Sequence, residues 1–190
     1  MTVTLLVSGT STAASALPTA AEPRCYSRAV NEWWCTDYLV DRRPELVDAT
    51  VEHLWITFTA VALAVLVAFP MALLARRHPR LESTVLGAST GLYTIPSLAL
   101  FPLLVPFTGI TATTVVIGLA LYALTILVRS MLDGLKSVPD DVRESADGLG
   151  YSPTSRLLKV ELPLALPVMM GGLRVATVST VALTTVGALV

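Results

Sequence analysis

The residues best suited to chemistry lie in one polar stretch, 140–167, which is set between long apolar segments. Its first part gathers four carboxylates and one guanidinium around small residues, namely Asp140, Asp141, Arg143, Glu144 and Asp147 around Ser145, Ala146 and Gly148. No Ser-His-Asp set, paired carboxylates or metal-ligand cluster stands near an apolar segment, so we predict neither a catalytic centre nor a metal site. A face of small residues among charges lets another protein surface approach closely. The pattern therefore favours docking to another protein.

Helix start and stop signals divide the stretch into two short helices joined by a glycine corner. In chain order the signals are Ser137, Pro139 and Asp140 for a start, Gly150 for a stop, Ser152 and Pro153 for a second start, and Pro163 for a second stop. Two other interpretations stay open. The stretch could be a solvated connector, or a DNA-reading helix-turn-helix, although its acidic first helix would repel phosphate.

The elements around this stretch are apolar enough to cross a bilayer. The 190 residues are 54% hydrophobic and 14% charged, with a mean hydropathy of +0.70, and too few charges are present to cover a soluble surface. A net charge of −1 gives no reason to expect a nucleic-acid partner. A span needs about 20 apolar residues. We therefore predict four spans and a connecting loop at 129–163, the spans lying at about 54–75, 84–105, 110–128 and 171–190.

Basic residues predict the orientation, because Lys and Arg concentrate in loops that stay in the cytoplasm. They fill the loops after the first and third predicted spans, at Arg76, Arg77, Arg80, Arg129, Lys136, Arg143, Arg156 and Lys159. The loop between the second and third spans carries no charge. We therefore expect a multi-pass protein of the cell membrane, with its N-terminus outside and the 129–163 loop in the cytoplasm.

The N-terminal residues, 1–43, form the predicted external tail, which has room for one short helix. Residues 1–21 lack the basic region that opens a secretory signal, which favours a tail over a cleaved peptide. Cys25 and Cys35 could form a disulfide in this external segment, or remain two separate thiols.

Within the second predicted span, "YTIPS" is the candidate for a solute pathway. Pro96 frees a backbone carbonyl, while Tyr93, Thr94 and Ser97 add polar groups. Broken helices are tolerated at membrane depth where they line a cavity. The alternative is a simple kink whose hydroxyls bond back to their own helix. The predicted spans hold no acidic residue, so a cationic solute would have to use aromatic faces.

The spacing in the loop resembles a family signature. Glu144-Ser145-Ala146, three residues, Gly150, nine residues, Val160, one residue and Leu162-Pro163 closely resemble the "EAA" signature of permease subunits of binding-protein-dependent ABC importers. The departures are Ser145 in place of alanine and Val160 in place of isoleucine. The resemblance implies that these residues form a coupling helix seated in a cleft of a separate ATPase subunit. The chain itself has no Gly-x-x-x-x-Gly-Lys-Ser/Thr phosphate loop.

Residues 53–190 further resemble permeases of the osmoprotectant branch, in "EHLWITFTAVALAVLVAFPMALLARR", "YTIPSLALFPLLVPFTGI" and "VELPLALPVMMGGLRVATV". The resemblance implies an all-α, polytopic transmembrane bundle of the type I ABC-importer permease kind, with four spans of an expected five. It implies transport of a quaternary amine such as glycine betaine, choline or carnitine. The implied partners are an ABC ATPase subunit that holds ATP, a second permease subunit, identical or homologous, an external substrate-binding protein and the lipid bilayer.

On this interpretation the chain is not an enzyme and binds no cofactor itself. Several alternatives stay open. The chain could be a fragment lacking the fifth span, or a truncated, non-transporting paralogue that acts as an assembly or regulatory partner. It could also carry another small solute, such as an amino acid. An integral-membrane enzyme is disfavoured, because no catalytic constellation stands near a span.

Overall fold

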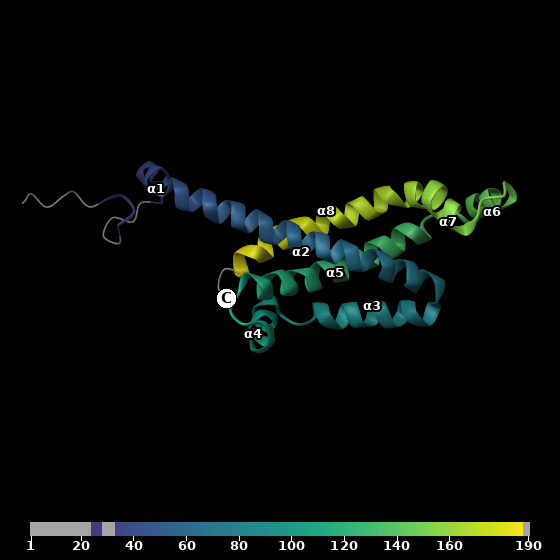
Figure 1. The fold of residues 1–190 in the computed structure, drawn as a ribbon, viewed down its shortest axis with the longest axis horizontal. Helices are drawn as coiled ribbons and strands as arrows, with labels where there is room; N and C mark the ends of the chain where they lie inside the picture. The colour runs from purple at the N-terminus through teal and green to yellow at the C-terminus, as the bar shows by residue number, and fades with distance from the viewer. Residues whose placement is uncertain (1–23, 28–32, 188–190) are drawn as a thin grey trace, which may run out of the picture. The chain divides into compact units, whose positions relative to one another are not determined.

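The computed structural model describes residues 24–27 and 33–187, and these are almost entirely helical, with no strand among them. Figure 1 shows the helices in chain order. They are α1 (Thr36–Asp41), α2 (Arg43–Arg77), α3 (Pro79–Tyr93), α4 (Ser97–Thr108), α5 (Ala112–Lys136), α6 (Asp140–Gly148), α7 (Pro153–Arg156), the π-helix η1 (Leu157–Glu161) and α8 (Leu162–Gly187). The all-α fold predicted from the sequence is therefore confirmed.

The chain divides into two units, Met1–Leu46 and Val47–Val190. In the described part of the first unit, Cys25 and Cys35 are joined by a disulfide, with their Cα atoms 5.8 Å apart. Asp41 of α1 accepts hydrogen bonds from Arg24 Nη1 at 2.6 Å and from the Tyr26 hydroxyl at 2.9 Å. Residues 1–23, and with them most of the predicted tail, lie outside the described residues.

In the second unit, α5 is the central helix and packs against α8, α3 and α4. It is apolar on most of its faces, as expected of a helix with neighbours on several sides. Its fully buried side chains include Leu119, Leu127, Leu132 and Leu135. The end of α5 that leads into α6 is thus anchored in the core.

Helix α2 presents a stripe of alanines to the bundle. Ala60, Ala64, Ala68, Ala72 and Ala75 recur every three or four residues and are at most 2% exposed. Small side chains at this spacing let two helix backbones approach closely in a membrane protein. Thr57, one turn before this stripe, hydrogen-bonds to Thr184 of α8 at 2.9 Å, so α2 and α8 are in contact there. The opposite face of α2 exposes large apolar side chains, including Phe58, Leu66 and Leu74, as a lipid-facing surface requires.

The segment at 84–105, predicted as one continuous span, is broken in the structure. Helices α3 and α4 meet at Thr94–Pro96 and are bent by 100° from each other, which makes either a broken span or a re-entrant loop. Pro96 has no amide hydrogen to continue α3, and it stands at the N-terminus of α4 instead. The described chain has three helices long and apolar enough to cross a membrane, or four if the bent pair forms one span.

The other helix boundaries also differ from the prediction. Helix α5 continues to Lys136, well into the predicted 129–163 loop, so Ser137 ends α5 and does not start α6. Helix α8 begins at Leu162 and runs through both Pro163 and Pro167, so it starts earlier than the predicted 171–190. Pro163 lies just after the π-helical turn η1, from which the chain continues into α8 without a break, so the predicted stop at Pro163 is absent.

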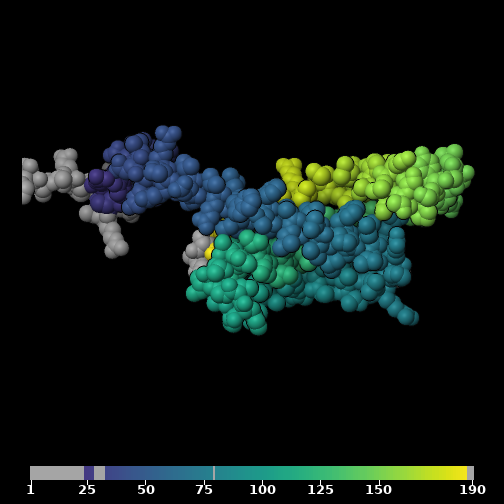
Figure 2. All heavy atoms as spheres, in the orientation of Figure 1, coloured from purple at the N-terminus to yellow at the C-terminus, as the bar shows by residue number. Residues whose placement is uncertain are grey.

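Helices α6 and α7 lie at one end of the second unit, beyond the start of α3 (Figures 1 and 2). Arg76 and Arg77, which end α2, lie at this same end. The junction between α4 and α5 lies at the other end (Figure 1). The two sites predicted from the sequence are therefore separate places, the helix pair at one end and the α3–α4 break partway along the bundle.

Candidate functional site

A glycine corner joins α6 to α7, and its hydrogen bonds fix its shape. Gly150 has φ +80°, the left-handed conformation that glycine adopts without strain. Its amide donates to Asp147 O at 2.9 Å, and the Tyr151 amide donates to Ala146 O at 3.2 Å. This pair of bonds is the Schellman motif, which satisfies the last carbonyls of a helix. The predicted stop at Gly150 is therefore present, with the geometry that favours glycine.

The second helix starts as the sequence predicted. The Ser152 hydroxyl accepts from the Ser155 amide at 3.3 Å, and Pro153 follows it in the first turn. This cap satisfies an amide that would otherwise lack a partner at the helix start. Stops and caps on both sides therefore hold the angle between α6 and α7.

Arg143 attaches α6 to the end of α5. Its guanidinium donates to Val138 O at 2.6 Å and to Leu135 O at 3.3 Å, and it pairs with Asp140 at 2.6 Å. Val138 is 2% exposed, so these bonds form at the edge of the core. Helix α6 is therefore held to the bundle at its first turn.

The signature residues divide into two groups by exposure. Glu144, Ser145 and Gly150 are exposed, whereas Ala146 is buried, and Val160 and Leu162 are half-buried. Pro163 is exposed in the first turn of α8. Glu144 pairs with no basic side chain of the described residues, so its charge is available to a partner.

A shallow hollow of about 280 Å³ lies between α6 and the following segment. It brings together the signature residues Ser145, Ala146 and Val160. Leu149 and Tyr151 also line it and are 78% and 37% exposed. Sequence reasoning missed these two residues. The available signal was two large apolar side chains flanking Gly150 in an otherwise polar corner.

The predicted pathway residues meet at the break between α3 and α4. Tyr93, Thr94, Pro96 and Ser97 line a cavity of about 220 Å³, together with Tyr122 of α5 and Ser179 and Thr180 of α8. The rings of Tyr93 and Tyr122 pack edge to face, with centroids 6.1 Å apart. Aromatic faces and hydroxyl groups thus dominate the polar part of this wall.

The carbonyl at the break whose partner is a side chain of another helix belongs to Ile95. The carbonyl that Pro96 leaves without its helical donor is that of Leu92, and it accepts from the Ile95 amide at 3.2 Å. The Ile95 carbonyl instead accepts from the Tyr122 hydroxyl. The Thr94 hydroxyl donates to Gly91 O at 2.6 Å, back into its own helix. Tyr122, which the sequence analysis did not single out, is therefore the side chain that braces the break.

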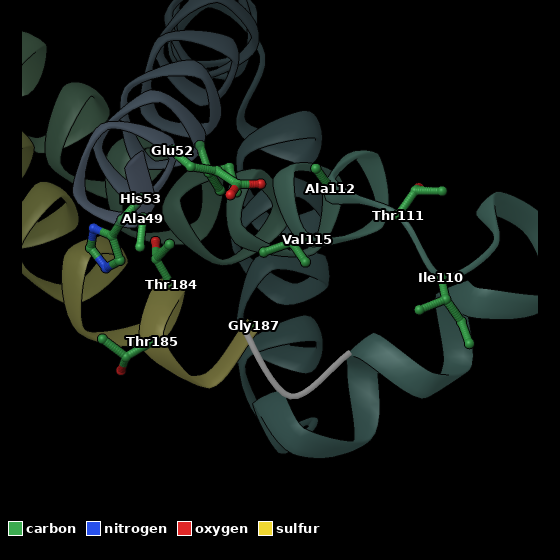
Figure 3. A pocket seen from close by; sticks show the side chains of 11 residues that line it. Ala49, Glu52, His53, Ile110, Thr111, Ala112, Val115, Thr184, Thr185 and Gly187 are labelled. Carbon is green, nitrogen blue, oxygen red and sulfur yellow. The ribbon is translucent and has the colours of Figure 1, made fainter. Parts of the chain in front are cut away.

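A further cavity, of about 520 Å³, lies at the other end of the bundle, between α2, α8 and the α4–α5 junction (Figure 3). Its wall is largely apolar and includes Val115 and Ile110. Glu52 and His53 line it from α2, and Thr184 and Thr185 line it from α8. Among the described residues, no three His, Cys, Asp or Glu side chains come together as a metal site.

Long apolar helices, a stripe of small residues and an exposed, tightly capped helix pair at one end define a polytopic helical membrane protein. The chain belongs to the family of binding-protein-dependent transport system inner membrane components, whose pattern matches residues 60–190. The curated relatives of this chain are named as transport permeases, which is a non-enzymatic role.

Three curated relatives that are named as permease proteins align with most of this chain. The chain is 39% identical over 158 residues to the osmoprotectant import permease protein OsmW of Salmonella typhimurium, covering 80% of this chain and 74% of the relative. It is 34% identical over 134 residues to the choline transport system permease protein OpuBB of Bacillus subtilis, covering 70% and 62%. It is 34% identical over 137 residues to the carnitine transport permease protein OpuCB of Listeria monocytogenes, covering 72% and 63%.

Proposed function

We propose that this chain is the permease subunit of an ATP-driven importer for a quaternary-amine osmoprotectant, and that residues 137–163 couple it to a separate ATPase. The observation that carries the proposal is the rigid corner between α6 and α7. It presents the signature residues at one end of the bundle, in a chain whose family works with partner proteins.

The coupling surface has an exposed part and a supporting part. Glu144, Ser145 and Gly150 are exposed and are the residues that would meet the ATPase. Ala146 is buried and Val160 and Leu162 are half-buried, so these three would support the exposed part, and Pro163 adds an exposed residue in the first turn of α8. Leu149 belongs with the exposed part, because an exposed leucine beside a shallow hollow suits a protein contact.

The proposed orientation places this surface in the cytoplasm, where ATP is present. The arginines that end α2 lie at the same end as α6, in agreement with the rule that basic loops stay inside. The N-terminus then lies outside. ATP binds the partner ATPase, and no cofactor binds this chain.

The proposed substrate class rests on the relatives and on the wall of the break. One relative is named for the import of osmoprotectants, and the other two for the transport of choline and of carnitine. A quaternary ammonium group is attracted to aromatic faces, and Tyr93 and Tyr122 provide these beside a cavity whose described lining holds no carboxylate. We assign solute selection mainly to an external binding protein. One chain forms half of the pathway, and a second permease subunit completes it.

Reconstitution tests this proposal. Proteoliposomes would hold this chain, the permease and ATPase subunits encoded beside it, and the matching binding protein, and labelled glycine betaine would be the probe. We expect ATP-dependent uptake that excess choline or carnitine reduces and an excess of a neutral amino acid does not. Uptake of the amino acid alone would overturn the substrate class. Failure of the chain to assemble with any ATPase would overturn the permease role and favour a non-transporting partner.

A further inference from the structure

Glu161 is the one charged side chain that is buried among the described residues, with 1% of its surface exposed. It stands at the end of η1, the π-helix between α7 and α8. An ionised carboxylate is costly to bury unless it is paired and hydrogen-bonded. Short π-helical segments are rare and are frequent at functional sites. Both features indicate that this position has a specific role.

Two arginines from different helices hold the Glu161 carboxylate. Arg76, in the last turn of α2, pairs with Oε2. Arg156, which ends α7, donates from Nε to Oε1 at 2.9 Å. Each carboxylate oxygen therefore faces its own guanidinium, and the charge is compensated from two sides.

The contact continues to the coupling surface, because Arg156 also pairs, through Nη1, with Asp147 of α6. We name the four residues Arg76, Glu161, Arg156 and Asp147 the ionic joint. Exposure of the side chains rises along it, from 2% at Glu161 to 24% at Arg156 and 51% at Asp147. The joint therefore runs from the buried junction of α2 and η1 outward to the exposed helix α6.

Stability alone does not explain the ionic joint. Replacing a buried ion pair by packed apolar residues is often neutral or stabilising, so burial of this charge is weak evidence for a stabilising role. The joint does fix direction, because charge-assisted contacts hold each Glu161 oxygen at a different arginine and Arg156 reaches two carboxylates at once. A cavity of about 390 Å³ beside it, lined by Arg77 and Thr154 among others, leaves the arginines room to move.

We propose that Glu161 is a positioning residue at the centre of the ionic joint, which ties α2 and α8 to α6 so that a displacement of α6 moves both long helices together. The inference rests on the proposed function in one respect, since the ATPase is the source of that displacement. Without the joint, α6 would transmit motion to α8 through the chain itself, and α2 would receive none directly.

The test compares three carboxylate-to-amide variants of the full chain in the reconstituted importer. Glu161→Gln removes the central charge, and Asp147→Asn removes the outer link at an exposed site. Glu82→Gln is the matched control, because Glu82 pairs with Lys136 at 2.5 Å at the α3–α5 contact, outside the joint. The readouts are the ATPase that co-purifies, the rate of ATP hydrolysis, and the glycine betaine imported per ATP hydrolysed.

We expect Glu161→Gln to co-purify with the ATPase as the unaltered chain does, yet to import at least about fivefold less solute per ATP, the scale of a typical coupling between sites. We expect Asp147→Asn to lower the same ratio by a smaller factor and Glu82→Gln to leave it unchanged. An unchanged ratio in Glu161→Gln would overturn the inference. If that variant does not fold, an unchanged ratio in Asp147→Asn would do so.

A second readout does not depend on the solute. Spin labels at positions 77 and 140, in a background with both native cysteines replaced by serine, report the distance between α2 and α6. We expect ATP binding to leave this distance unchanged in the otherwise unaltered chain and to change it in Glu161→Gln. A change of equal size in both would overturn the ionic joint. Failure of the unaltered chain to bind any ATPase would instead overturn the proposed function.

Discussion

Gly150→Ala is the substitution that isolates the shape of the corner from its contacts. A Cβ at Gly150 meets no atom within 4 Å, so the change creates no collision. The backbone at φ +80° is the only obstacle, and a residue other than glycine adopts it at a cost of roughly 1–2 kcal/mol. The corner must then bear that strain or rearrange.

The expected effect follows from that cost. One to two kcal/mol lowers the ratio of the native corner to its alternatives by a factor of about 5–30. Apparent affinity for a partner falls with the fraction of the chain in the competent shape, so we expect binding to the ATPase to weaken up to that factor. Gly150→Pro adds the loss of the hydrogen bond to Asp147 O and requires a negative φ, so we expect it to abolish binding.

Gly148→Ala is the control, because Gly148 ends α6 in helical conformation and its Cβ also meets nothing within 4 Å. Alanine there favours the helix by up to about 1 kcal/mol, so binding should be unchanged or slightly stronger. The assay is titration of the purified ATPase subunit against each variant in nanodiscs. Equal affinities of the ATPase for Gly150→Ala and Gly148→Ala would refute the reasoning that the ATPase recognises the shape of the corner.

Two further predictions concern the bundle and the break. Gly172→Ala places a Cβ against Ser130 of α5, so we expect it to lower the free energy of unfolding by about 1–3 kcal/mol, the usual cost of overpacking. Gly171 faces open space, so Gly171→Ala should leave the free energy of unfolding unchanged. Thermal unfolding in detergent measures both. Tyr122→Phe removes the hydroxyl that donates to Ile95 O, at a cost of about 1–3 kcal/mol for the stranded carbonyl. We expect reduced solute uptake with normal ATPase co-purification, and unchanged uptake would show that the brace has no role in the pathway.

The helix pair could be predicted from the sequence because its signals are local. Gly150 and Ser152 act through their own backbone and their nearest neighbours, and the structure places both as a stop and a cap. The membrane-spanning helices could be predicted equally well, because a long uncharged apolar run has few alternatives to a helix. The prediction that Ser137 starts the first short helix was wrong. Ser137 precedes Asp140 at the spacing of a cap, but α5 continues to Lys136 and Ser137 ends it.

Long-range contacts account for what the sequence did not reveal. Proline signals near 96 and 163 look alike, yet the chain bends by 100° at the first and continues as a helix through the second. At 163 the preceding turn is π-helical, with the Leu162 amide donating to Leu157 O. Glu161 reads as one more charge in a polar loop, and its burial depends on Arg76, from a distant part of the chain.

The most direct measurement of the central claim is co-purification of the ATPase subunit with Glu144→Lys. Glu144 is exposed on α6, so reversing its charge changes the proposed docking surface and leaves the packed core alone. Glu52→Lys, at an exposed site near the other end of the bundle, is the control. We predict normal membrane insertion of both variants, loss of the ATPase from Glu144→Lys, and full retention by Glu52→Lys. Retention of the ATPase by Glu144→Lys at the level of the unaltered chain would contradict the account.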